Sequence, residues 1–392
     1  MKTKYAITTI FAAVIGLSAC QKPNVVNNTS NSASNVIRIA SVSPLSGGSA
    51  NAGTDNLNGA TMAVEEINAN GGIEVAGKKY TLELVAEDDA ADPKQGTTVA
   101  QKIADDKSIV AVVGHYNSGV TMAANPIYAR ANLVAITPDA TNPDVIGKAP
   151  KTDSGITSMY RMVAHDGMRG PAMAVFAQGR GYKKMAVFDD ATAFGKGAAD
   201  QVENKSKELG IEIVTRESLT DKTTDFKTVL TKAKSSGVDS IMWGGLDDTA
   251  ATLVKQAREL GLTAALFSPD ACTDNYMKLA GKAAEGTVCS VSGIPLSEMK
   301  AGADFKKRYE KRFAGQTVQA YSPYAYDAVY VVAEAIKKAG VTNDRAKIAA
   351  AVANVQIQGL TGDIAFEATG ERKNPVVSFV EAQGGTWKTV TK

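Results

Sequence analysis

A serine at the start of a predicted helix is the residue whose position most directly suggests binding. Ser118 follows an apolar segment that ends at Gly114 and precedes a helical pattern that begins near Val120, which predicts an N-cap position. The first turn of a helix carries unpaired backbone N–H groups and partial positive charge, so a carboxylate could bind there. The same position would also suit a serine that only caps the helix.

Cys20 is the second residue whose surroundings indicate chemistry. Two of the first four residues are lysines, and residues 5–19 form an apolar run that is too short to span a bilayer as a helix. This pattern predicts a secretion signal over residues 1–19. The run ends in Leu-Ser-Ala-Cys at Cys20, which resembles the lipobox of bacterial lipoproteins and implies a lipid on its sulfur. Ordinary cleavage that leaves Cys20 as a free thiol is the alternative.

Composition separates a linker from a globular body. Residues 20–35 comprise Cys20 and an Asn- and Ser-rich stretch without helix or strand period, which predicts a flexible linker. The length that follows suggests two domains, and no further long apolar stretch occurs, which predicts a soluble body. A formal net charge of +2 indicates neither a nucleic-acid partner nor a polybasic membrane face.

The few cysteines and histidines give no pattern for catalysis or metal binding. Cys272 and Cys289 could form a disulfide in an exported protein, but the geometry decides, and two free thiols remain the alternative. His115 and His165 are the only histidines, and surface or core roles are predicted for both. No zinc spacing, nucleophile-base pair or phosphate-binding glycine loop is present, so we expect no enzyme, metal or cofactor.

Alternating short Val- and Ile-rich runs and longer helical patterns predict an α/β fold with parallel sheets covered by helices on both faces. Strands are expected at 36–41, 81–86, 109–114, 133–137, 184–188, 240–244, 265–268 and 287–291. Helices are expected at 58–69, 94–105, 120–131, 168–179, 195–209, 225–235, 249–260, 305–313 and 325–339. Glycines in residues 359–390 predict short antiparallel hairpins there.

A series of short motifs runs through nearly the whole body. They are Pro44-Leu45-Ser46-Gly47, Asn58-Gly59-Ala60, residues 63–68, Gly71-Gly72-Ile73, Asp88-Asp89, residues 92–95, residues 113–115 with Ser118, residues 137–143, Phe194-Gly195, Asp225-Phe226, Gly244-Gly245, residues 256–258 and Glu285-Gly286. With these motifs the chain resembles the branched-chain amino acid (Leu/Ile/Val) substrate-binding proteins of ABC transporters, a type I periplasmic binding protein family.

The resemblance implies two doubly wound parallel-sheet lobes joined by three crossing strands, with the ligand in the cleft between them. On this chain it places lobe one at residues 36–160 plus 291–361, and lobe two at residues 161–290 plus 362–392. Open α/β sheets bind ligands at the carboxyl ends of their strands, which is where the motifs lie.

The resemblance also implies roles for individual residues. Ser118 and Thr141 match residues that hold the α-carboxylate of the ligand. Asp270 matches an acidic residue, usually Glu, that pairs with the α-ammonium. Asp139, with Ala140 in the same turn, stands where the family has a small residue whose backbone carbonyl accepts a hydrogen bond from the ammonium. Roles as turn or capping residues remain the alternatives.

Several positions depart from the family pattern. Phe194 and Leu246 stand where tyrosines are common, and Ala52 replaces an aromatic residue near the first helix. Tyr321 matches an aromatic residue that contacts the ligand side chain. The extra carboxylate of Asp139 could pair with a second cationic or polar group of the ligand, or it could be a turn residue.

These observations predict a substrate-binding lipoprotein of an ABC importer. Its expected partners are a small-molecule ligand, most simply an amino acid, and the membrane subunits of a permease. We expect a monomer that is exported to the periplasm or cell surface and is anchored to a membrane through Cys20. A sensory receptor of the same fold, for a small amide, short-chain acid or other nitrogenous metabolite, is the alternative.

Overall fold

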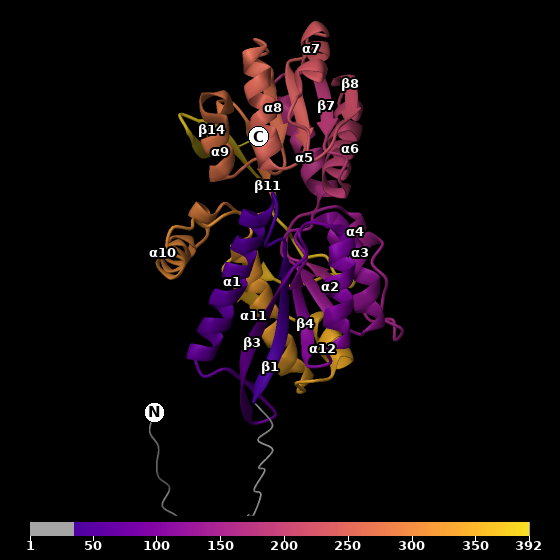
Figure 1. Cartoon of the computed structure of the whole chain (residues 1–392), viewed down its shortest axis with the longest axis vertical. Helices are drawn as coiled ribbons and strands as arrows, with labels where there is room; N and C mark the ends of the chain where they lie inside the picture. Colours follow the sequence, from indigo (N-terminus) through magenta and orange to yellow (C-terminus); the bar gives the residue numbers. More distant parts are fainter. Residues whose placement is uncertain (1–34, 392) are drawn as a thin grey trace, which may run out of the picture. The chain divides into compact units, whose positions relative to one another are not determined.

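The computed structural model describes residues 35–391, which form two sheets built mainly of parallel strands (Figure 1). The strand order is β2-β3-β1-β4-β5-β6 in the first sheet and β15-β14-β11-β10-β9-β7-β8 in the second, and β12 and β13 pair separately. We call the segments around the first sheet lobe one and those around the second sheet lobe two. The predicted signal peptide, Cys20 and all but the last residue of the predicted linker lie outside the described residues.

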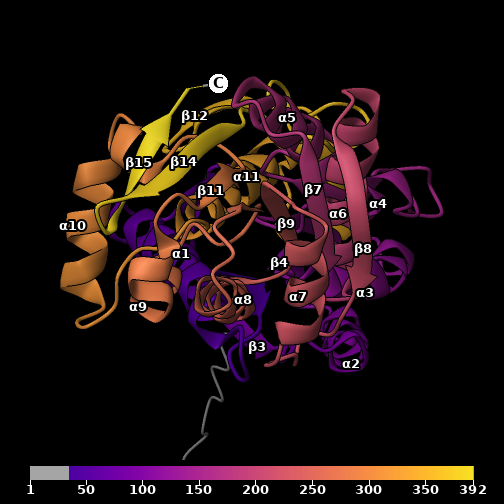
Figure 2. The ribbon, with the colours of Figure 1, turned by 90° about the horizontal axis from the view of Figure 1, so that it is seen from above.

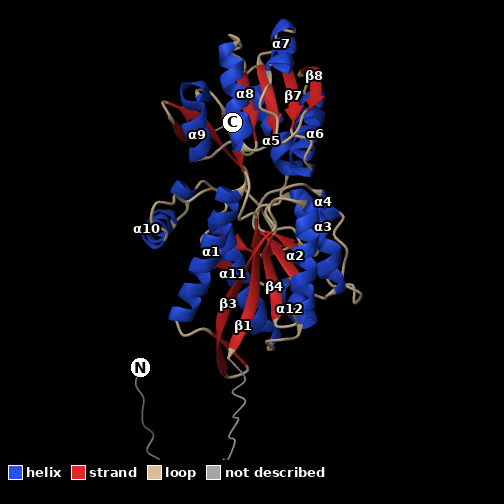
Figure 3. Cartoon of the chain, viewed as in Figure 1, coloured by secondary structure: helices blue, strands red, loops and turns tan. Residues whose placement is uncertain are grey.

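The strands alternate with helices along most of the chain (Figure 3). The strands are β1 (Val36–Ser43), β2 (Ile73–Val75), β3 (Lys78–Asp88), β4 (Ile109–Gly114), β5 (Val134–Thr137), β6 (Met159–Arg161), β7 (Lys184–Asp189), β8 (Glu212–Ser218), β9 (Ser240–Gly244), β10 (Ala265–Ser268), β11 (Val288–Val291), β12 (Ile357–Gly359), β13 (Gly362–Ile364), β14 (Ser378–Gln383) and β15 (Thr386–Val390).

The helices of the described residues differ widely in length. They are α1 (Ala50–Ala69), α2 (Pro93–Asp105), α3 (Ser118–Arg130), α4 (Asp144–Gly147), α5 (Asp166–Gly179), α6 (Ala193–Glu208), α7 (Lys227–Ser235), α8 (Asp247–Glu259), α9 (Asp274–Ala280), α10 (Gly302–Arg312), α11 (Ser322–Ala339) and α12 (Arg345–Val352), with 3₁₀ turns at Gly281–Ala284 and Leu296–Glu298.

Lobe one is a three-layered structure. Helices α1, α11 and α12 pack on one face of the first sheet, and α2 and α3 pack on the other. The strands between these layers are buried on both faces, which is why they read as continuous apolar runs. Helices α1 and α11 can approach closely because residue 59 is glycine. A Cβ atom at Gly59 would lie only 2.2 Å from the carbonyl oxygen of Ser322. Burial of each Val or Ile side chain contributes roughly 1.5–3 kcal/mol, so these layers fix the loops at the strand ends.

Lobe two repeats this arrangement. Helices α7, α8 and α9 cover one face of the second sheet, and α5 and α6 cover the other. Strands β14 and β15 extend the sheet antiparallel beside β11, as Figure 2 shows. Within residues 35–391 the chain passes between the two lobes three times, after β6, after β11 and after β13.

The α/β fold class, the parallel strands and the late hairpins are confirmed, and the boundaries show where the prediction fell short. Helix α1 begins at residue 50, whereas the pattern predicted residue 58. Strands β2, β6 and β8 and helices α4, α9 and α12 were not predicted. Among the described residues, no helix has the length and apolar character needed to cross a membrane.

Candidate functional site

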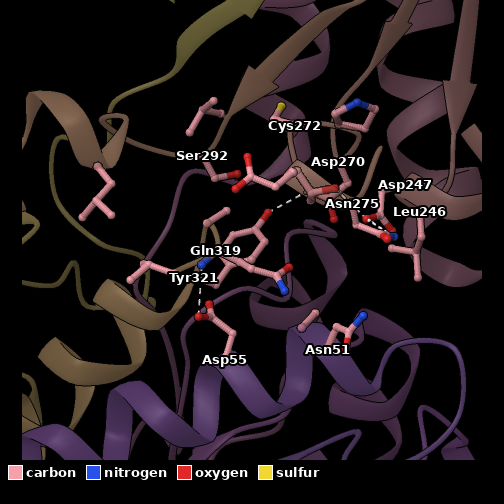
Figure 4. A pocket seen from close by; sticks show the side chains of 18 of the residues that line it. Asn51, Asp55, Leu246, Asp247, Asp270, Cys272, Asn275, Ser292, Gln319 and Tyr321 are labelled. Atoms are coloured by element: carbon pink, nitrogen blue, oxygen red, sulfur yellow. Dashed lines mark hydrogen bonds between the residues drawn. The ribbon is translucent and has the colours of Figure 1, made fainter. Parts of the chain in front are cut away.

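A pocket of about 220 Å³ is lined by residues of both lobes (Figure 4). Lobe one contributes the first turns of α1, Tyr116 after β4 and the segment before α11. Lobe two contributes the start of α8, the loop after β10 and the residues that follow β11. Tyr116, Leu246 and Asp270 each stand two residues beyond the carboxyl end of a parallel strand, which is where α/β sheets bind ligands.

Three of the eight predicted ligand-binding residues line this pocket, namely Leu246, Asp270 and Tyr321. Asp270 Oδ1 accepts a hydrogen bond of 2.8 Å from the Tyr321 hydroxyl, and Arg169 Nη2 lies 3.5 Å from the same oxygen. Figure 4 shows the Tyr321–Asp270 contact. Burial raises the pKa of Asp270 to about 6, although the charge of Arg169 and the Tyr321 hydrogen bond act in the opposite direction. Asp270 is therefore a desolvated carboxylate within reach of a ligand.

Arg169 fixes the position of Asp270. Its guanidinium is 1% exposed and donates hydrogen bonds to the carbonyl oxygens of Pro269 and Ser290. Arg169 Nη1 also lies 3.2 Å from Asp166 Oδ1, so one buried positive charge is shared between two carboxylates. The Asp270 charge is only partly compensated as a result.

Ser118 and Thr141 are buried, but neither lines the pocket. The structure places Ser118 at the first residue of α3 and makes Asn117 the N-cap, so the predicted N-cap position was wrong by one residue. Ser118 Oγ accepts a 3.2 Å hydrogen bond from the backbone N–H of Asn142, which leaves its own hydroxyl hydrogen to donate. The Thr141 hydroxyl donates instead to Asp166 Oδ2 at 2.9 Å.

Asp139 and Ala140 lie in the turn after β5, also outside the pocket lining. Asp139 Oδ2 accepts a hydrogen bond from Asn56 Nδ2 on α1. Burial raises the pKa of Asp139 well above its usual range, the Asn56 hydrogen bond opposes this, and the charge of Asp270 adds to it. The carbonyl of Ala140 accepts a 2.8 Å hydrogen bond from Arg161 Nη1, so this carbonyl already has a partner.

The two positions at which the resemblance implied tyrosines, Phe194 and Leu246, have different surroundings in the structure. Phe194 lies in the first turn of α6 and packs into the core between α5, α6 and the second sheet rather than lining the pocket. Leu246 is the N-cap residue of α8, its carbonyl accepts hydrogen bonds from the Ala250 N–H and from Thr249 Oγ1, and it lines the pocket.

Tyr116 and Asp55 are among the pocket residues of lobe one that were not predicted from the sequence. The Tyr116 ring meets the Tyr321 ring edge to face, with centroids 6.0 Å apart. The Asp55 carboxylate accepts hydrogen bonds from the backbone N–H groups of Gln319 and Ser322, and burial raises its pKa to about 6. Asp55 could have been found by extending the helical pattern from the Asn58 motif towards the N-terminus.

A buried hydrogen-bond chain holds the loops of lobe one. His115 Nδ1 lies 2.7 Å from Asp89 Oδ2, and His115 Nε2 lies 2.9 Å from the Tyr128 hydroxyl. The carbonyl of His115 accepts a 2.7 Å hydrogen bond from Thr137 Oγ1, which in turn accepts from the Ala140 N–H. Of the surface and core roles that were predicted for the histidines, His115 has the core role, and it connects the turn after β4 to the turn after β5.

The cysteines and acidic residues of the described chain give no sign of a metal site. Cys272 and Cys289 are both free thiols, and Cys272 lines the pocket. No group of three or more His, Cys, Asp or Glu side chains among residues 35–391 is arranged to hold a metal ion.

Comparisons with known proteins agree with this architecture. The family model described as periplasmic binding protein matches residues 36–386. A Leu/Ile/Val-binding protein homolog from Brucella suis is 34% identical over 85% of this chain and 86% of its own length. A Pseudomonas aeruginosa protein named amino acid binding protein is 33% identical over 91% of this chain and 93% of its own.

Solved structures show the same fold. A leucine-binding protein from Thermotoga maritima superposes with a TM-score of 0.81 at 26% identity, covering 91% of this chain and 98% of its own. A branched-chain amino acid transporter substrate-binding protein from Streptococcus pneumoniae, in complex with isoleucine, gives a TM-score of 0.80 at 26% identity, covering 91% of this chain and 100% of its own.

Proposed function

Because the chain belongs to the periplasmic binding protein family, we propose that it captures an amino acid, branched-chain or related, and delivers it to the membrane subunits of an ABC importer. The observation that carries this proposal is a pocket lined by both lobes, with a desolvated Asp270 carboxylate in its wall. The names of the relatives and the isoleucine complex of the Streptococcus pneumoniae protein support an amino acid as the ligand. The family consists of binding proteins, so the proposed function includes no chemical reaction.

In this proposal lobe one holds the ligand carboxylate at the start of α3. The helix has 13 residues and begins at Ser118, so its first backbone N–H groups and its dipole favour an anion there. The Ser118 hydroxyl would donate a further hydrogen bond, and the turn that contains Thr141 would complete the site. Neutral donors are sufficient for this task because the ligand carboxylate brings the charge.

Lobe two would bind the α-ammonium group through Asp270. An ionised carboxylate and an ammonium group form a charge-assisted hydrogen bond that is roughly twice as strong as a neutral one. The backbone carbonyl of Asp139 would accept a second hydrogen bond from the ammonium group, whereas that of Ala140 is already bound by Arg161. Tyr321 and Leu246 would contact the ligand side chain, and Phe194 would support the wall behind them.

The division of contacts between the lobes explains how ligand binding could close the protein. A ligand shifts a conformational equilibrium only if it binds one state better than the other, and here it would touch both lobes only when they are together. We place the lobe boundaries at residues 160–161, 290–291 and 361–362, near the ends of β6, β11 and β13, after which the described chain passes between the lobes. The permease would then recognise the closed form.

A thermal-shift screen with the free amino acids tests the proposal. A ligand present at 100 times its dissociation constant stabilises the folded state by about 2.7 kcal/mol, which raises the melting temperature by several degrees. We expect at least one amino acid to produce this shift. A flat result with every amino acid, measured at millimolar concentrations, would contradict amino acid capture.

Membership of this family implies export to the periplasm, and we propose that a lipid on Cys20 then anchors the protein to a membrane. A Cys20→Ser variant would lack the attachment sulfur and should move from the membrane fraction to the soluble fraction of the cell. A Cys289→Ser variant serves as the control, since that thiol is buried in lobe two. Equal membrane retention of the parent and of Cys20→Ser would contradict the anchor.

A further inference from the structure

The pocket wall carries an excess of negative charge. Among the described residues that line it, five are aspartates and none is Lys, Arg or His; the aspartates are Asp55, Asp247, Asp248, Asp270 and Asp274. Behind the wall, Arg169 lies 3.5 Å from Asp270 and partly compensates that one charge. The hydrogen bonds that the carboxylates accept come from neutral groups, such as the Thr273 hydroxyl to Asp247 and the backbone N–H groups to Asp55. Neutral donors do not cancel charge, so the cavity favours a cationic ligand group.

A second observation is a pair of buried acceptors without donors beside this wall. Asn56 follows the pocket residue Asp55 on α1 and donates a hydrogen bond from Nδ2 to Asp139 Oδ2. The remaining oxygens, Asn56 Oδ1 and Asp139 Oδ1, have no hydrogen-bond partner within the described chain, although the two side chains are only 1% and 5% exposed. Buried acceptors of this kind are rare and costly in folded proteins. A ligand that donates N–H groups would satisfy both.

The Asp139 carboxylate lies beside the pocket wall, because it is hydrogen-bonded to Asn56, which follows the pocket residue Asp55 in α1. After burial and the Asn56 hydrogen bond, the charges of Asp270, Asp89 and Asp55 influence its pKa, and all three raise it. Two of these three residues, Asp270 and Asp55, line the pocket. The third residue, Asp89, is hydrogen-bonded to His115.

Aromatic rings complete this region. Tyr116 and Tyr321 line the pocket, and their rings meet edge to face with centroids 6.0 Å apart. The charges of both Asp270 and Asp139 raise the pKa of each tyrosine, in addition to the larger effect of burial. The faces of aromatic rings attract cations, so carboxylates and tyrosines together form surroundings suited to a second positively charged nitrogen.

We propose that the ligand is a dibasic amino acid, whose side-chain cation reaches past the pocket lining to Asp139 and Asn56 while its α-ammonium binds at Asp270. This inference rests on the proposed function, because it assumes that the pocket takes an amino acid. The second cation would donate hydrogen bonds to the two unpartnered oxygens and would compensate the Asp139 charge. A branched-chain amino acid would leave both oxygens without donors.

Calorimetry with matched ligand pairs tests the inference. Lysine and norleucine share the same four side-chain carbons and differ by the terminal ammonium, and arginine and citrulline differ by the guanidinium charge. We expect the charged member of at least one pair to bind at least about tenfold more tightly than its neutral partner. Leucine or norleucine binding as tightly as lysine, together with citrulline binding as tightly as arginine, would overturn the inference.

A pair of variants assigns the preference to the Asp139 carboxylate. Asp139→Asn keeps the size of the side chain and removes its charge, and it should reduce the affinity ratio of the charged to the neutral ligand by about tenfold. Asp105→Asn is the matched control: it makes the same substitution at an exposed residue at the carboxyl end of α2. The control should leave the ratio unchanged, because exposed charges are screened by salt. If Asp139→Asn folds and its affinity ratio of charged to neutral ligand is unchanged, the assignment of the cation site to Asp139 is overturned. If this variant does not fold, the ligand pairs still test in the parent protein whether the ligand is a dibasic amino acid.

The same experiment separates failure of the inference from failure of the proposed function. Binding of leucine with no preference for lysine or arginine would support amino acid capture and overturn the dibasic ligand. Cadaverine has both nitrogens of lysine but no carboxylate. If it bound as tightly as lysine, a second cation site would be supported, but amino acid recognition would be contradicted. We expect cadaverine to bind at least about tenfold more weakly than lysine, because it cannot use the α3 N-terminus.

Discussion

The two lobes offer a ligand very different groups. Lobe two presents Asp270, a carboxylate whose charge is only partly compensated by Arg169, which Asp166 also shares. Lobe one presents the first turn of α3, where Ser118 Oγ accepts a hydrogen bond from a backbone N–H, and the turn after β5, where the Thr141 hydroxyl donates to Asp166. Under the proposed function, the α-ammonium would therefore depend on one side chain in lobe two, whereas the α-carboxylate would be held in lobe one by several backbone groups that no single substitution removes.

This difference predicts that the largest loss of affinity follows substitution in lobe two. Asp270→Ala would leave the ligand ammonium desolvated without its charged partner, which costs about 3–5 kcal/mol, or more than 100-fold in affinity. Ser118→Ala would remove one hydroxyl while the α3 N–H groups remain, at a cost of about 1.5–3 kcal/mol. Calorimetry on both variants with the same amino acid provides the measurement.

The order of the two effects is the decisive result. If Ser118→Ala weakened binding more than Asp270→Ala, the proposal that several backbone groups of lobe one share the binding of the carboxylate would be wrong. Asp270→Asn separates charge from shape, because it retains the side-chain size and an oxygen that can accept from Tyr321. Its affinity should lie between those of the parent and Asp270→Ala.

A smaller effect is expected from pH. Burial raises the pKa of Asp270 to about 6, and Arg169, Tyr321, Asp166 and Asp247 are the other groups whose charges or hydrogen bonds influence it. The ligand ammonium stabilises the ionised carboxylate, so the pKa of Asp270 falls on binding. Affinity should then be constant above about pH 7 and fall roughly tenfold by pH 5, since binding must release a proton.

The stability of the ligand-free protein should change with pH in the opposite direction. Because burial raises the folded-state pKa of Asp270 above that of an ordinary aspartate, to about 6, protonation of Asp270 favours the folded state, and this contribution disappears as pH rises through about 6. Calorimetry between pH 5 and pH 8 measures the affinity, and thermal melts measure the stability. An affinity of Asp270→Asn that is less dependent on pH than that of the parent would identify the titrating group, whereas identical profiles would assign the effect elsewhere.

From the sequence, the strand ends at the site were predicted more accurately than the contacts of the side chains. Strands β4, β5, β9 and β10 were predicted within a residue or two, because buried parallel strands are continuous apolar runs. The first two turns of α1 were missed because Asn51, Gly53 and Asp55 are weak helix formers. Gly53 is suited to its position by a close approach to Pro44, where a Cβ atom would lie 1.9 Å from the carbonyl oxygen.

Side-chain contacts between segments that are distant in the sequence could not be predicted from local sequence patterns. The contact of Asp139 with Asn56 joins the turn after β5 to α1, and that of Thr141 with Asp166 joins the same turn to α5. Each depends on how helices pack over the sheets, which the spacing of residues in the sequence does not specify. The role of Asp270 was accessible because it follows β10 directly and the family resemblance gave it a function.

The smallest loss of ligand affinity is expected for substitution of Thr141, and it tests whether binding in lobe one depends on a single side chain. Its hydroxyl donates to Asp166 Oδ2 in this structure, so a ligand carboxylate would have to compete for that hydrogen atom. Thr141→Val should weaken ligand binding by less than about 1 kcal/mol, because the backbone groups of the turn remain.

The same substitution leaves the buried Asp166 carboxylate with one donor fewer, so it should lower the free energy of unfolding by about 1–3 kcal/mol. Calorimetry and urea denaturation on one variant separate these two quantities, with Thr141→Ser, which keeps the hydroxyl, as the control. A loss of affinity for Thr141→Val comparable to that of Asp270→Ala would show that lobe one also relies on a single side chain, and the contrast between the lobes would fail.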